Sequence, residues 1–354
     1  MRVRKKIVNR VLAACITIGA VCGGGAMLSV QSFSPESGSP IEATLVHEIK
    51  IDVTADSLPG KRRDLIQVIW SKDALPNGWP NLRKAGMAPY GADMPPAELW
   101  FVSLPAGVNS RIHYWRNGGT KLVMYHGGHG AELDKPSLLP KLWNEGWSVL
   151  YVNMPLEGGN DRPIVQHPKF GSFQLLSHAH LQLVDLAGYS LLQLFMQPIV
   201  EALNRATAEV PTNRVAMVGF SGGGWATTLY AALDKRIDVS VPIAGSLPMF
   251  LRNAPPFKSL GDAEQIYPPL LAVADYLDLY VMATDGGRQQ LQILNRRDPC
   301  CFRGEQAHTY AQSVRSASME CGGAWDLWID DTHAKHTISG AAESRVLSYI
   351  APSK

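Results

Sequence analysis

The sequence predicts an α/β protein with a doubly wound, mostly parallel sheet and an antiparallel hairpin at its N-terminal edge. Short apolar runs, typical of buried strands, alternate with segments whose apolar residues recur at helical spacing. Alternation of this kind builds parallel sheets covered by helices. The 354-residue chain is 46% hydrophobic and 18% charged, which is an ordinary composition for a folded globular protein.

The N-terminal 30 residues have the pattern of an export signal. Residues 1–10 carry positive charges only, and the chargeless apolar stretch Val11–Val30 follows them. Gly24 and Ala26 supply small residues at the −3 and −1 positions of a cleavage site. The alternative is an uncleaved membrane anchor, because the stretch is just long enough to span a bilayer. We therefore expect a periplasmic or secreted protein that contacts membrane only if this segment stays attached.

A linker and one large domain are expected after the signal. Residues 31–40 are rich in Ser, Pro and Gly and predict a flexible linker, and residues 41–354 predict the domain. Its first strand-like content lies in Ala43–Ala55 and Arg63–Trp70. Glu98–Gly119 then alternates around a Pro-Ala-Gly turn and predicts the edge hairpin.

Six buried strands are expected after the hairpin: Thr120–His126, Trp147–Met154, Val215–Phe220, Asp238–Gly245, Gln290–Asn295 and Trp325–Asp331. Helical spacing occurs in Tyr189–Ala206, Gly222–Arg236 and Gly340–Ile350. Two longer stretches without a clear strand, 155–188 and 247–288, predict cap segments over the upper edge of the sheet.

A serine at the junction of a predicted strand and helix is the candidate nucleophile. Gly219-Phe220-Ser221-Gly222-Gly223 matches G-x-S-x-G, the pattern of a sharp strand-to-helix turn that exposes a serine hydroxyl. The flanking glycines are needed because side chains there would collide with neighbouring backbone. The pattern also arises by chance in glycine-rich loops, but the strand before it and the helix after it favour the catalytic interpretation.

A glycine run after an earlier strand predicts an oxyanion hole. One donor would be the backbone N–H that follows the nucleophile, that of Gly222. The second would come from the run that begins at His126, where Gly128 is the first choice and Gly127 the second. A plain turn is the alternative interpretation.

The acid and base of a serine hydrolase should follow the serine, each just beyond a later strand. Asp298 lies three residues after Gln290–Asn295 and is the expected acid, with Asp285 as its rival. His336 directly precedes the last predicted helix and is the expected base, with His333 as its rival.

These elements together resemble the α/β-hydrolase superfamily. The resemblance runs from about Ala43 to Ile350 and rests on the HGG run, the GFSGG turn, Asp298 and His336, in that order. It implies a serine hydrolase of the esterase or lipase kind, with a small-molecule or lipid-like ester as substrate and no cofactor. The acid departs from the pattern because it stands in an unusual NRRDPCCF context.

Two other classes of function remain open. A metal-dependent hydrolase could use His126 with His129 (H-x-x-H) and His178 with His180 (H-x-H). The serine site of the main hypothesis requires no metal. A non-catalytic binding module on a hydrolase scaffold is the other.

Nucleic acid is not an expected partner, because 33 basic residues nearly balance 31 acidic ones and no basic stripe follows the signal. Peptidase activity is a close variant of the main hypothesis, and the sequence predicts no oligomeric state.

Three cysteines remain once the signal is removed. Cys300 and Cys301 follow the upper end of one expected strand, whereas Cys321 precedes the lower end of the next. Such ends lie about 15–20 Å apart, which is beyond disulfide reach. A bond between the adjacent Cys300 and Cys301 and a pair of free thiols are both open.

Overall fold

The computed structural model describes residues 49–91, 93–132, 137–252 and 259–351. These residues belong to one compact unit, His47–Lys354. The predicted signal (1–30), the linker (31–40) and residues 43–48 of the first strand-like segment lie outside the described residues. No helix among the described residues has the length and apolar character needed to cross a membrane.

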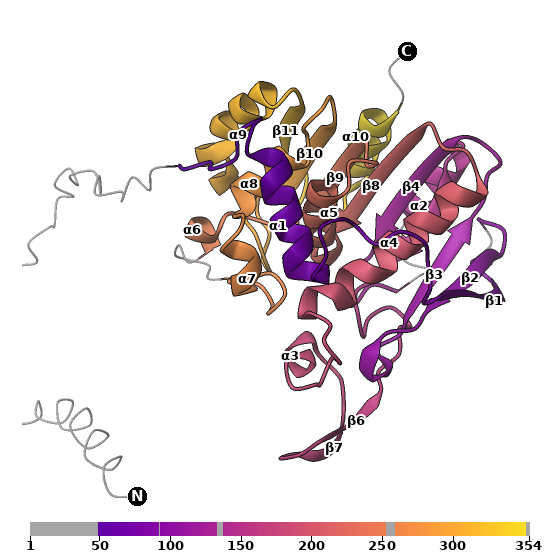
Figure 1. Cartoon of the computed structure of the whole chain (residues 1–354). Coiled ribbons are helices and arrows are strands. Elements are labelled where there is room, and N and C mark those ends of the chain that lie inside the picture. The colour runs from indigo at the N-terminus through magenta and orange to yellow at the C-terminus, as the bar shows by residue number, and fades with distance from the viewer. Residues whose placement is uncertain (1–48, 92, 133–136, 253–258, 352–354) are drawn as a thin grey trace, which may run out of the picture. The chain divides into compact units, whose positions relative to one another are not determined.

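A nine-stranded sheet forms the centre of the unit (Figure 1), with the order β1-β2-β3-β5-β4-β8-β9-β10-β11. Its strands are β1 (Leu82–Ala88), β2 (Ala97–Val102), β3 (Ser110–Trp115), β4 (Lys121–His126), β5 (Ser148–Val152), β8 (Arg214–Phe220), β9 (Val239–Ile243), β10 (Gln289–Asn295) and β11 (Ala324–Asp330). Six neighbouring strands of the sheet are parallel, namely β5, β4, β8, β9, β10 and β11. At the other edge, β1, β2 and β3 pair antiparallel. The predicted parallel sheet with an antiparallel N-terminal edge is confirmed.

Helices cover both faces of this sheet because its strands are apolar on both sides. In β4, Leu122 and Met124 enter one hydrophobic cluster and Val123 and Tyr125 enter the other, as the period of two requires. The first cluster packs under α1 (Leu58–Trp70), α4 (Leu191–Glu209), α5 (Gly222–Leu233), α8 (Tyr276–Met282) and α9 (His308–Glu320). The second packs under α2 (Leu138–Asn144) and α10 (Gly340–Ile350).

Two early segments differ from the prediction. Arg63–Trp70 was expected to be a strand and forms the second half of α1, since buried Leu58, Arg62, Leu65 and Ile69 recur at helical spacing. Residues 49–55, the described end of the other strand-like segment, form no strand. The edge also gains β1, whose mostly exposed residues carry no strand pattern and whose pairing comes from β2.

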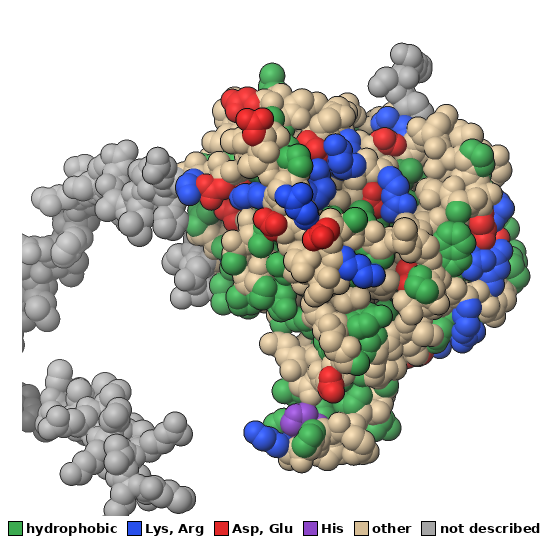
Figure 2. Space-filling view, in the orientation of Figure 1, with side chains coloured by type: hydrophobic (Ala, Val, Ile, Leu, Met, Phe, Trp, Pro, Cys, Tyr) green, Lys and Arg blue, Asp and Glu red, His purple; other side chains and the backbone are tan. Residues whose placement is uncertain are grey.

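The two stretches proposed as cap segments contain short elements. Residues 155–188 form α3 (His178–Leu181) and, against expectation, two strands, β6 (Ile164–His167) and β7 (Gly171–Gln174). This hairpin projects from the body (Figures 1 and 2) and exposes Ile164 and Phe170. The stretch 247–288 contains α6 (Met249–Arg252), α7 (Pro268–Leu271) and α8, of which α8 packs against α5 and α9. On the face shown in Figure 2, Lys and Arg are interspersed with Asp and Glu.

Candidate active site

Ser221 occupies a strained turn between β8 and α5. Its backbone has φ 56° and ψ −123°, a conformation that non-glycine residues rarely adopt. The Ser221 N–H donates to the carbonyl of Ile243 at the end of the neighbouring strand, which fixes the turn against the sheet. The serine side chain therefore stands at the carboxyl edge of the parallel strands, at the N-terminus of α5.

The glycines around Ser221 are required by close backbone approaches. A Cβ on Gly219 would lie 2.1 Å from the carbonyl oxygen of Gly223, and a Cβ on Gly223 would lie 2.0 Å from that of His126. Real Cβ atoms do not come so close to backbone oxygens. The sequence pattern thus reflects how tightly α5 sits against β4 and β8.

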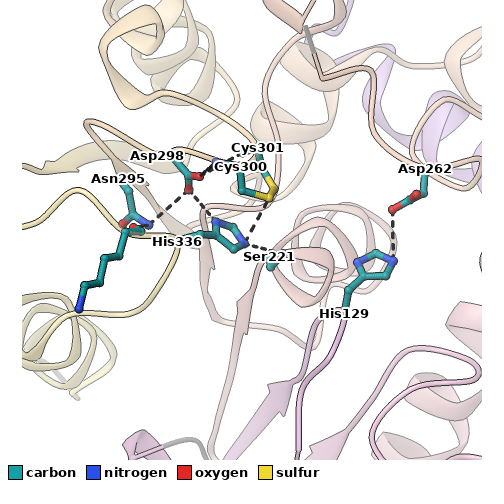
Figure 3. The surroundings of a disulfide bond; sticks show 9 residues. His129, Ser221, Asp262, Asn295, Asp298, Cys300, Cys301 and His336 are labelled. Atoms are coloured by element: carbon teal, nitrogen blue, oxygen red, sulfur yellow. Dashed lines mark hydrogen bonds and ion pairs between the residues drawn. A yellow bond between two sulfur atoms is a disulfide. The ribbon is translucent and has the colours of Figure 1, made fainter. Parts of the chain in front are cut away.

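The structure brings Ser221, His336 and Asp298 into one hydrogen-bonded chain (Figure 3). His336 Nε2 lies 2.9 Å from Ser221 Oγ, and His336 Nδ1 lies 2.6 Å from Asp298 Oδ2. With the proton on Nδ1 donated to the carboxylate, Nε2 is free to accept the serine proton. This is the geometry that a serine nucleophile, a general base and an orienting carboxylate require.

Asp298 is buried yet held in its ionised form. Burial raises its pKa, but the hydrogen bond from His336, the charge of that histidine and two backbone N–H groups together outweigh burial, so the pKa lies below the usual range of an aspartate. The backbone N–H groups of Cys300 and Cys301 also donate to Oδ1, at 2.9 and 3.0 Å, and act in the same direction. The unusual DPCC context of the acid therefore supplies two of its hydrogen bonds.

Asn295, which sequence reasoning did not single out, holds the histidine loop in place. Its Nδ2 donates to the carbonyls of Lys335 and Thr337, the residues on the two sides of His336, at 3.2 and 3.1 Å. Asn295 ends β10 and is fully buried, so its side chain points from the sheet into the loop. Its place as the last residue of a predicted strand, three residues before Asp298, was the available signal.

The two rival residues lie in other surroundings. Asp285 forms buried ion pairs with Arg62 and Arg288, at 2.7 Å for the first, and these charges hold its pKa low despite burial. His333 lies 3.2 Å from Asp330, and its Nδ1 accepts the N–H of Lys335. No hydrogen bond joins either rival to Ser221 within the described part of the chain.

The backbones of Gly128 and Gly222 lie beside the serine. A Cβ on Gly128 would lie 3.0 Å from both Gly222 N and Ser221 Cβ, so the two segments are in close contact. The N–H of Gly222 is the first of α5 and has no acceptor within the helix. The N–H of Gly127, the second choice for the oxyanion hole, donates to the Val152 carbonyl at 2.9 Å and is not free for a substrate.

Cys300 and Cys301 form a disulfide with each other, and Cys321 is a free, half-buried thiol. Of the two alternatives left open by the sequence, the structure thus contains the adjacent disulfide. Cys301 Sγ lies 4.0 Å from His336 Nε2, which places the bond against the base (Figure 3).

A second cluster of polar side chains lies next to the serine turn. It contains His129, His178, Asp262 and Glu264, whose nearest ligand atoms all lie within 4.8 Å of one another. Each predicted histidine pair contributes one member only. His126 Nδ1 instead contacts the carbonyl of Gly127 in its own loop, where burial lowers its pKa to about 4. His180 Nδ1 accepts the N–H of Leu176.

A cavity of about 220 Å³ borders the turn on the side of the loop that carries Gly128. Gly128, Phe220 and Thr337 are among the residues that line it. It lies next to the glycine expected to bind an oxyanion and so offers space for part of a substrate.

No family model and no curated protein sequence matches this chain. Solved structures do resemble it. The acetyl xylan esterase from Paenibacillus sp. R4 has 16% identity and a TM-score of 0.56, over 85% of this chain and 95% of that one. Acetyl xylan esterase 1 from Thermoanaerobacterium sp. JW/SL YS485 has 14% identity and a TM-score of 0.57, over 83% and 93%. A methylesterase has 16% identity and a TM-score of 0.54, over 84% and 62%. With the sheet order and the serine turn between β8 and α5, these likenesses show that the chain has the α/β-hydrolase fold.

Proposed function

We propose that the protein is a serine hydrolase that cleaves carboxylic esters through a covalent acyl-enzyme. The hydrogen-bonded chain from Asp298 through His336 to Ser221 carries this proposal. The same residue types in the same roles activate serine nucleophiles on several unrelated folds. The structurally similar acetyl xylan esterases and methylesterase add support for ester cleavage.

The reaction follows from the positions of these groups. Ser221 Oγ attacks the ester carbonyl while His336 Nε2 takes its proton, and Asp298 stabilises the imidazolium that forms. The N–H groups of Gly128 and Gly222 receive the developing oxyanion. His336 then returns the proton to the leaving alcohol, and a water activated by the same histidine releases the acid from Ser221.

Small esters fit the surroundings best. The 220 Å³ cavity beside Gly128 is smaller than the roughly 300–1,000 Å³ typical of sites for drug-sized ligands. This size favours a short acyl or alcohol group within the cavity. Export through residues 1–30, and coverage of the site by residues 155–188 and 247–288, remain parts of the proposal.

A fluorophosphonate probe tests the nucleophile. Incubation of the signal-free protein should add one probe mass, measured on the intact protein, and Ser221→Ala should add none. p-Nitrophenyl acetate should then be hydrolysed by the wild type and roughly 10⁴- to 10⁶-fold more slowly by Ser221→Ala. The absence of an adduct on protein that is folded by circular dichroism would contradict the proposal and favour a non-catalytic binding module.

A further inference from the structure

His129, His178, Asp262 and Glu264 come from three separate segments that meet beside the serine turn. His129 follows the glycine run after β4, His178 begins α3, and Asp262 and Glu264 lie between α6 and α7. Figure 3 shows His129 and Asp262 facing each other near Ser221. Contacts between such distant segments require a favourable interaction where they meet.

We propose that these four side chains bind one divalent transition-metal ion, for which Zn²⁺ is the best match. Two imidazole nitrogens and two carboxylate oxygens form a ligand set that zinc prefers. Calcium and magnesium favour oxygen ligands alone, so both should bind weakly.

The distances between donor atoms fit a tetrahedral ion. His129 Nε2 lies 3.0 Å from His178 Nδ1, 3.2 Å from Asp262 Oδ2 and 3.9 Å from Glu264 Oε1. His178 Nδ1 lies 3.0 Å from Glu264 Oε1. Ligands at about 2.05 Å around tetrahedral zinc stand roughly 3.3 Å apart, which is close to these four distances, and the other two pairs of ligand atoms lie within 4.8 Å of each other.

The tautomer of His178 leaves a lone pair pointing into the cluster. Its Nε2 lies 2.9 Å from the carbonyl oxygen of Pro155, which can only accept, so Nε2 carries a hydrogen. In the neutral ring, Nδ1 is then an acceptor that faces the carboxylate of Glu264 and Nε2 of His129. An ion among these acceptors replaces their mutual repulsion with bonds.

A second proton on His178 is the competing way to satisfy this cluster. Burial lowers the pKa of His178, but the hydrogen bonds to Glu264 and Pro155 and the nearby carboxylate charges together outweigh burial, so the pKa is raised. One proton gives Glu264 Oε1 a donor. This proton leaves the charge of the Asp262 carboxylate, which contacts His129, without compensation, so the cluster keeps a net negative charge. A divalent ion neutralises both carboxylates.

Glu264 gives an independent sign of a missing partner. Its side chain is fully buried, and among the described residues its Oε2 has no hydrogen-bond partner. A buried carboxylate oxygen without a hydrogen-bond donor or cation is strongly unfavourable. The guanidinium of Arg252, which is close in sequence, donates to the backbone of Leu247 and Leu260 and to Gln265 instead.

The exposure of the four side chains suits an ion that enters from solvent. His178 and Glu264 are 3% and 0% exposed, whereas His129 and Asp262 are 36% and 53% exposed. The buried pair can hold the ion from below while the exposed pair closes over it. Such a site loads and releases metal without unfolding of the core.

The ion would also fix the oxyanion loop, and this step rests on the proposed function. His129 directly follows Gly128, and its Nδ1 would lie 3.0 Å from a Cβ placed on Gly222. An ion that ties His129 to α3 and to Asp262 therefore restrains the loop that carries one oxyanion donor. We assign His129 a positioning role, with no direct contact to the reacting atoms.

Titration of metal-stripped protein with zinc chloride tests the site. A tag-free protein, treated with chelator and dialysed, should bind one Zn²⁺ per chain by calorimetry and unfold at a higher temperature when loaded. Asp262→Asn, at an exposed position, and Glu264→Gln, which keeps the shape of the side chain, should each weaken zinc binding more than about 100-fold. The reason is that even groups that only orient ligands are worth 10–100-fold.

His180→Gln is the matched control, since it lies in the same helix outside the cluster and should bind zinc like the wild type. Zinc binding unchanged in Asp262→Asn and Glu264→Gln, or absent from folded wild-type protein, would overturn the site. Removal of zinc should lower kcat for p-nitrophenyl acetate several-fold, and equal rates in both states would overturn the positioning step. If zinc binds but Ser221 takes no fluorophosphonate, the proposed function fails and the metal site stands.

Discussion

Two series of contacting side chains flank the serine turn, and each of these two chains begins with a carboxylate and an imidazole. They differ in the group at which each one ends. Asp298 and His336 lead to the hydroxyl of Ser221, whereas Glu264 and His178 lead to a second imidazole, that of His129. In both chains the carboxylate is fully buried and contacts Nδ1 of the histidine. A carboxylate–imidazole pair thus occurs twice around this turn.

The remaining contacts of each chain account for the difference in chemistry. Asp298 receives two backbone N–H groups in addition to His336, so its charge is compensated by hydrogen bonds alone. Glu264 lacks such donors among the described residues and has an oxygen without a partner. A compensated carboxylate can orient a base for proton transfer, whereas an uncompensated one needs a cation. The donors around the acid, more than the acid–histidine pair, separate a catalytic site from a metal site.

Exchange of each carboxylate for its amide is the sharpest way to break this comparison. Asp298→Asn should lower kcat for ester hydrolysis roughly 10⁴-fold, because the amide favours the wrong tautomer of His336, and should leave zinc affinity unchanged. Glu264→Gln should weaken zinc binding more than about 100-fold and lower kcat only several-fold. The measurements are steady-state hydrolysis of p-nitrophenyl acetate and zinc calorimetry on both variants. Loss of both properties in either variant would mean that the two chains form one functional unit.

Gly128→Ala should have the next largest effect, because Gly128 lies between the two chains. Its Cβ would lie 2.6 Å from the carbonyl oxygen of Phe220, so the loop must shift away from Ser221. Displacement of one oxyanion donor should lower kcat about 10²- to 10³-fold with a smaller change in KM. Gly340→Ala is the matched control, since a Cβ at that position meets no atom within 4 Å. Equal activity of the two variants would remove Gly128 from the proposed oxyanion hole.

The hydrogen-bonded arrangement of Ser221, His336 and Asp298 was foreseeable from sequence because these residues stand at fixed places in a regular topology. Parallel strands buried on both faces read as continuous apolar runs, and Ser221, Asp298 and His336 each follow one of those runs. Their carboxyl ends share one edge of the sheet, so the order of strands alone brings the three residues together. Local spacing and strand order therefore carried enough information to predict both the sheet and this part of the site.

The metal cluster was not foreseeable in the same way. Asp262 and Glu264 lie in an irregular segment, and their contacts with His129 span more than a hundred residues. Spacing suggested His126 and His180 as partners, but both face their own loops. Long-range packing decided these partners. The strand expected at Arg63–Trp70 was wrong for a different reason, because β-branched content was weighed above the helical spacing of buried residues in α1.

Removal of the adjacent disulfide should have the smallest effect and sharpens the comparison at the acid. In Cys300→Ser/Cys301→Ser the backbone N–H groups that donate to Asp298 remain, so the carboxylate keeps its donors in a less constrained turn. Partial loss of these hydrogen bonds, each worth about 1 kcal/mol, should lower kcat/KM by about tenfold at most. Cys321→Ser is the control and should match the wild type, because Cys321 takes part in no disulfide. A loss as large as that of Asp298→Asn would show that the disulfide itself holds Asp298 in its working position. The hydrogen bonds from the backbone would then not be enough to distinguish Asp298 from Glu264, whose charge the proposed metal ion compensates.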